Sequence, residues 1–182
     1  MSLIPITFGS VNVTSVAQLT TRQIGSLTST QVQSMSSTEV STLSASQVDA
    51  LAVSQLTTDQ IQSLTNLEVS ELTTSQVQSL TTDQFASLSS GQIAAMLPGQ
   101  IKSITTDQIQ VIPAASITRG EIASFTTGQI SALTTDQVAG LNFTQLQSMT
   151  GAQLASFSSD QVNVITTTAL VTLTDTHIHF PF

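Results

Sequence analysis

The chain repeats an eight-residue unit, and this repeat constrains its fold more than any other feature. The unit is clearest at residues 57–64, Thr-Thr-Asp-Gln-Ile-Gln-Ser-Leu, and most other segments are variants of it. Its apolar positions are spaced by three and then five residues, an average of four, so they would drift off any single face of a 3.6-residue α-helix. Positions three apart also point to opposite faces of a β-strand. One long helix, a coiled coil and a sheet are therefore excluded.

Each unit, called an octad below, carries its own helix-start signal. A Thr or Ser opens the octad and a Gln or Glu follows three residues later, as Thr57 and Gln60 do. This is a capping box, in which each of the two side chains accepts a hydrogen bond from the backbone N–H of the other residue. The β-branched and hydroxyl residues that open the octads suit caps better than helix interiors. The sequence predicts an all-α solenoid of short capped helices of about one and a half to two turns each.

A longer period is nested in the octads. Pentamers at 52–56 and 113–117 interrupt them, so that seven octads and a pentamer form a block of 61 residues at 57–117 and again at 118–178. We expect one solenoid over 1–182, with coils at 1–56, 57–117 and 118–178, a tail at 179–182, and 4–11 as a degenerate first octad. Such an offset would stack glutamines of successive coils in an inter-coil ladder, formed by Gln76, Gln84, Gln92, Gln100, Gln137, Gln145, Gln153 and Gln161.

The composition argues against several classes of partner. The basic residues are Arg22, Lys102 and Arg119 alone, and the net charge is −8, whereas nucleic acids and anionic membranes attract clustered Lys and Arg. A coat of Ser, Thr and Gln gives little charge repulsion between copies, which favours self-association. Cysteine is absent, so neither disulfides nor thiolate metal sites are expected. We predict no cofactor, no nucleic-acid partner and no insertion into a membrane.

The first residues, Met-Ser-Leu-Ile-Pro-Ile-Thr-Phe, have no basic segment before their apolar residues. No apolar run reaches the roughly 18 residues that span a bilayer. These features predict a protein without a cleaved Sec signal peptide, either exported by another route or cytoplasmic.

Candidate sites for chemistry are few. Asp175, His177 and His179 form an Asp-x-His-x-His cluster that could bind a transition metal, or simply make the polar face of a terminal segment. The paired threonines, such as Thr57 and Thr58, could form an array that matches a polysaccharide or ice lattice, or could serve only as helix caps. No nucleophile with a base, no carboxylate pair and no phosphate-binding glycine loop is present, so we expect no enzyme activity.

The octad Thr-Thr-Asp-Gln-Ile/Val-x-x-Leu resembles the Leu-Thr-Thr-x-Gln-Val/Ile repeat arrays of secreted, adhesin-like surface proteins of proteobacteria. The resemblance covers residues 20–173 and implies no active site. It implies a location outside the cell or on its surface.

Both chain ends are apolar, whereas solenoids normally carry polar caps that prevent end-to-end stacking. The sequence therefore predicts a structural protein that joins head to tail into an extracellular filament or surface fibre. An adhesin-like or lattice-binding surface module is the alternative. The residues expected at the subunit interface are Leu3, Ile4, Ile6, Phe8, Ile178, Phe180 and Phe182.

Overall fold

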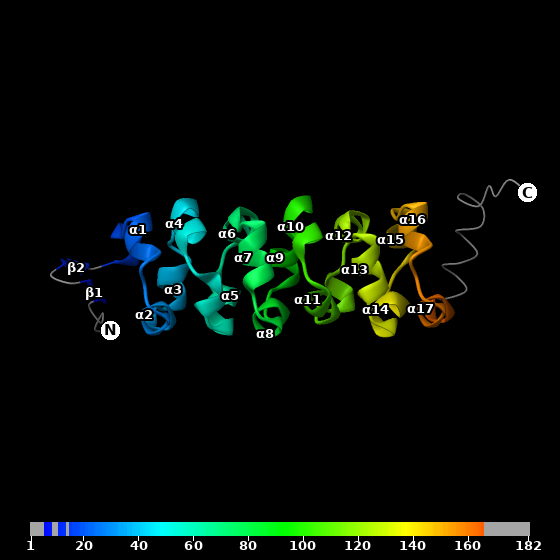
Figure 1. Cartoon of the computed structure of the whole chain (residues 1–182), viewed down its shortest axis with the longest axis horizontal. Coiled ribbons are helices and arrows are strands. Elements are labelled where there is room, and N and C mark those ends of the chain that lie inside the picture. The colour runs from blue at the N-terminus through cyan, green and yellow to red at the C-terminus, as the bar shows by residue number, and fades with distance from the viewer. Residues whose placement is uncertain (1–5, 9–10, 14, 166–182) are drawn as a thin grey trace, which may run out of the picture. The chain divides into compact units, whose positions relative to one another are not determined.

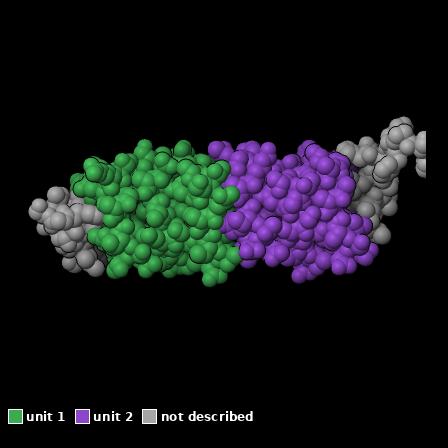
Figure 2. All heavy atoms as spheres, viewed as in Figure 1, with its two compact units in different colours: residues 1–96 green, residues 97–182 purple. Residues whose placement is uncertain are grey.

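The computed structural model describes residues 6–8, 11–13 and 15–165 (Figure 1). The chain divides into two compact units, residues 1–96 and 97–182, which are described separately below (Figure 2). In both units almost all of the described residues lie in short helices or in the bends between them. The predicted all-α solenoid of short helices is confirmed.

Unit 1 begins with a two-stranded antiparallel hairpin, β1 (Ile6–Phe8) and β2 (Val11–Val13), in which Ile6 pairs with Val13. The expected degenerate octad at 4–11 is wrong here, because apolar and polar residues alternate in both segments, as in strands. The helical elements of unit 1 follow in the order η1 (Val16–Gln18), α1 (Thr21–Ile24), α2 (Ser29–Ser34), α3 (Ser37–Val40), α4 (Ala45–Ala50), η2 (Val53–Gln55), α5 (Thr58–Ser63), α6 (Asn66–Glu71), α7 (Thr74–Ser79), α8 (Thr82–Ala86) and α9 (Ser90–Ala94).

Unit 2 has the same construction. The two pentamers of the sequence form the 3-10 helices η2 in unit 1 and η3 in unit 2, whereas the octads form α-helices. The elements of unit 2 are α10 (Pro98–Ser103), α11 (Thr106–Gln110), η3 (Ala114–Ser116), α12 (Arg119–Ser124), α13 (Thr127–Ala132), α14 (Thr135–Ala139), α15 (Phe143–Gln147), α16 (Gly151–Leu154) and α17 (Ser159–Val164).

The predicted capping box starts the helices. In α5 the Thr57 hydroxyl accepts from the backbone N–H of Gln60 at 3.2 Å, and Oε1 of Gln60 accepts from the N–H of Thr57 at 2.8 Å. Within 15–165, α10 is the one α-helix whose N-cap residue, Leu97, provides no side-chain acceptor. These reciprocal bonds satisfy two backbone donors that an uncapped helix would leave unpaired.

In α5 and several other helices the C-cap is the large apolar residue that closes the octad. Leu64 has an extended ψ of 135°, so it leaves the helical path, and its N–H donates to the Ile61 carbonyl at 3.2 Å. Ile61 and Leu64 are 0% and 3% exposed, and the equivalent residues of most other octads are buried as well. Each octad therefore contributes two apolar side chains to the core of its unit.

Each element packs against the third element along the chain. Examples are the contacts of α1 with α4 and of α6 with α9 in unit 1, and of α14 with α17 in unit 2. Such contacts join residues about three octads apart, so the predicted 61-residue coil is too long to be one turn. The reason is that the chain changes direction at the end of every short helix, and only three or four elements are needed to bring it back beside itself.

Candidate functional site: glutamine contacts between turns

The Gln at the third helical position has both ends of its amide in use. In α9, Oε1 of Gln92 accepts from the Ser89 N–H at 2.8 Å, which caps its own helix. Nε2 of Gln92 donates to the carbonyls of Ile61 and Leu64, at 2.9 and 2.8 Å. Gln92 is 2% exposed. One side chain thus caps a helix and fastens it to the fourth element before it.

The same step recurs throughout each unit. Gln153 donates to the carbonyls of Ile122 and Phe125, 31 and 28 residues earlier. Where a pentamer lies between the two elements, the intervals fall to 28 and 25 residues, as for Gln129 and its acceptors Ile101 and Ile104. The difference of three residues is the difference between an octad and a pentamer. The contact therefore follows the order of elements and not a fixed number of residues.

Within residues 15–165, the octad-closing carbonyl of Leu64 has no other hydrogen-bond donor than the Nε2 group of Gln92. At an octad-closing residue such as Leu64 the helix has ended, so its carbonyl has no intrahelical N–H to accept. A buried carbonyl without a partner costs free energy comparable to a lost hydrogen bond. The Nε2 group of Gln92 provides the missing donor. Gln92 and most of its equivalents are consequently part of the buried structure and not of the surface.

This geometry corrects the predicted inter-coil ladder. Gln76 donates to the carbonyls of Val48 and Leu51, and Gln137 to those of Ile109 and Ile112, so the expected pairing of Gln76 with Gln137 is wrong. Backbone carbonyls, and not amides, are likewise the acceptors of Gln84, Gln92, Gln145, Gln153 and Gln161. Oε1 of Gln100, the remaining member, accepts from the Leu97 N–H. The prediction failed because a backbone acceptor has no signature in the sequence.

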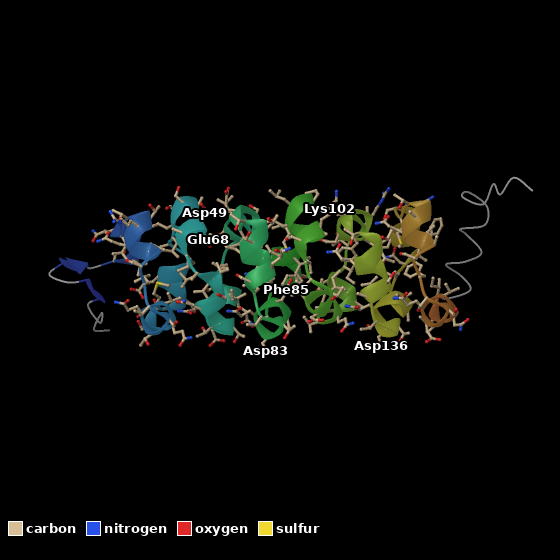
Figure 3. The ribbon with its side chains drawn as sticks, in the orientation of Figure 1. Asp49, Glu68, Asp83, Phe85, Lys102 and Asp136 are labelled. Carbon is tan, nitrogen blue, oxygen red and sulfur yellow. The ribbon has the colours of Figure 1, made fainter. Side chains whose placement is uncertain are left out.

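Glu68 departs from the pattern. Its Oε2 caps α6 by accepting from the Thr65 N–H at 2.6 Å, but its Oε1 is buried and has no hydrogen-bond partner. The residue, labelled in Figure 3, is 5% exposed and belongs to unit 1. A carboxylate has no proton to donate at the place where the neighbouring octads donate from an amide.

The exposed side of each helix carries the hydroxyls and most of the charges. Asp83 and Asp136 lie at the edge of the ribbon, whereas Phe85 lies inside it and is 0% exposed (Figure 3). In the Thr57-Thr58 pair the first hydroxyl is already the acceptor of the cap bond, and both residues are exposed. A complete array of free Thr hydroxyls is therefore not formed by these pairs.

Several predicted site residues lie outside the described residues, namely Asp175, His177, His179, Leu3, Ile4, Ile178, Phe180 and Phe182. Ile6 and Phe8 belong to β1, of which the backbone alone is described. Among the described residues, no three His, Asp or Glu side chains gather where they could hold a metal ion. No helix in the same part of the chain is long and apolar enough to cross a membrane.

No family model matches this chain, and no curated protein matches it either.

Proposed function

We propose that this protein is a structural subunit that assembles head to tail with copies of itself into a filament or fibre. The observation that carries the proposal is the contact from the capping Gln of most octads to the fourth preceding element, exemplified by Gln92 on Ile61 and Leu64. This contact joins two unlike faces, a donor face and an acceptor face, that nearly every octad possesses. A contact between unlike faces, when it is repeated, gives a ring if the rotation closes and an open filament if it does not, and we propose the open filament.

Assembly outside the cell is part of the proposal and rests on the resemblance of the octads to surface-protein repeats. The polar coat fits a fibre subunit, because it holds few charges that would repel neighbouring copies. The adhesive or lattice-binding alternative has less support, since the first Thr of a pair such as Thr57-Thr58 uses its hydroxyl as a helix cap.

The test is the state of association of the purified protein. Sedimentation velocity over a range of concentrations, with negative-stain electron microscopy of the same samples, should show growing polymers of regular subunit spacing. A monomer at every concentration and ionic strength would rule out the proposed function.

A further inference from the structure

Two glutamines of unit 1 carry amide groups that lack the usual acceptor. In α1 and α2, Oε1 of Gln23 and Gln31 accepts the N–H of its own N-cap at 2.8 and 2.9 Å, as in other octads. No helical element lies four places before these helices, and neither Nε2 donates a hydrogen bond within the described part of the chain. Both side chains are half-buried, whereas Gln92 and most later equivalents are buried.

The last helices of unit 2 offer the matching acceptors. Within residues 15–165, the octad-closing carbonyls of Leu141, Met149, Phe157 and Ile165 accept no hydrogen bond, whereas the Leu133 carbonyl accepts from Gln161 at 2.7 Å. In the sequence the next octad, 166–173, has Ala169 where Gln is usual, and the pentamer 174–178 after it contains no Gln, so neither brings an amide.

We propose that Gln23 and Gln31 are donors at the joint between subunits, and that the acceptors are free octad-closing carbonyls in the last helices of a second copy. This inference rests on the proposed function and names the chemistry of its contact. Inside each unit the same kinds of group meet at distances such as the 2.6 Å from Nε2 of Gln84 to the Leu56 carbonyl. The joint would repeat an interaction that the fold already uses.

The arrangement of these groups favours a second copy over an unrelated peptide. An extended peptide presents donors and acceptors in alternation along its edge. Here one end presents side-chain donors at octad spacing, and carbonyls at octad spacing are found at the other end of the same sequence. The joint is directional, because donors and acceptors lie on different ends of the chain.

The decisive variant is the double substitution Q23E/Q31E. Glu retains the capping box, as Glu39 shows in α3, where its Oε2 accepts the Ser36 N–H at 2.8 Å. The change removes the Nε2 donors and places carboxylates against carbonyls. The matched control is Q33E/Q62E, which adds the same charge at exposed positions of α2 and α5. We expect the critical concentration for assembly to rise about tenfold or more in the first variant and to stay unchanged in the control.

A second measurement uses the octad-closing carbonyls of the last helices, which Q23E/Q31E retains. Q23E/Q31E added in small amounts should dock on one end of wild-type filaments and stop growth there, so mean filament length falls. Circular dichroism checks that the variant is folded; if it is not, Q23E and Q31E are tested singly, and each should raise the critical concentration. Unchanged critical concentrations in the folded variants would overturn the inference and leave the proposed function intact, whereas wild-type protein that never assembles would overturn the proposed function itself.

Discussion

Glu68 places a carboxyl group where the adjacent octads have an amide. Its neighbours Gln60 and Gln76 donate to carbonyls 28 and 25 residues earlier. The same step directs Glu68 toward the carbonyls of Val40 and Leu43, and its buried Oε1 has no partner. We expect Glu68→Gln to raise the free energy of unfolding by about 1–3 kcal/mol, because the amide supplies the missing donor.

Urea denaturation followed by circular dichroism would measure this change. The matched control is Glu39→Gln, at the equivalent position of α3, where no helical element lies four places earlier and the side chain is half-buried. Glu39→Gln should leave the free energy of unfolding nearly unchanged. A destabilised Glu68→Gln variant, or equal effects at both positions, would contradict the role assigned to the amide.

Substitution of Gln84 tests whether one amide both caps its own helix and bonds to another element. Its Oε1 accepts from the Thr81 N–H at 2.8 Å, and its Nε2 donates to the carbonyls of Leu56 and Val53 at 2.6 and 3.2 Å. Gln84→Ala removes the cap partner and leaves buried carbonyls unpaired, at a cost of about 1–3 kcal/mol. Gln62→Ala, at an exposed position, should change the thermal midpoint little. Similar midpoints for both variants would disprove the dual role.

Among the described α-helices, α10 is the one whose N-cap lacks a side-chain acceptor, so its start can be stabilised by substitution. Its N-cap, Leu97, has the same extended backbone as the Thr and Ser caps, with φ −74° and ψ 155°, but no side-chain acceptor. Leu97 is also 55% exposed. Leu97→Thr should stabilise the protein by about 0.5–2 kcal/mol through the new cap bond. Leu67→Thr, at an exposed site inside α6, provides no cap and should not stabilise; a gain at Leu67 equal to that at Leu97 would refute the capping explanation.

The individual elements could be predicted from the sequence, because their chemistry is local. The pair Thr57 and Gln60 specifies a helix start within four residues, and Leu64 marks its end. The length of a turn could not be predicted in the same way. It depends on how far the chain bends at each extended residue such as Leu64, and repetition alone does not reveal that angle. A block of 61 residues contains eight elements, whereas the glutamine contacts within each unit step back four.

The capping role of the glutamines could be predicted from the sequence, but their acceptors could not. The sequence identifies Gln92 as a capping residue and indicates that its amide reaches another turn. Its acceptors are the carbonyls of Ile61 and Leu64, and a backbone carbonyl is the same in every residue. The missing partner of Glu68 is a feature of the folded chain and has no counterpart in the sequence.

At the scale of the whole molecule, the apolar end segments remain predicted parts of the joint. Removing residues 179–182 takes away Phe180 and Phe182 without touching any described helix. We expect a folded protein with unchanged circular dichroism that no longer forms sedimenting polymers, because apolar area is lost from the contact. Filaments that persist with the same subunit spacing would show that these four residues are not part of the joint.

The glutamine contacts also have a consequence for how the chain folds. The Nε2 bonds described above connect residues 25 to 31 positions apart, such as Gln76 with Leu51 and Gln92 with Ile61. Only a short loop must close before each one forms, and the entropy lost in closing a loop grows with its length. Folding can thus nucleate at many places along the repeat and spread one element at a time, as in other repeat proteins. Low contact order of this kind is associated with refolding in microseconds to milliseconds, despite the number of elements that must find their places.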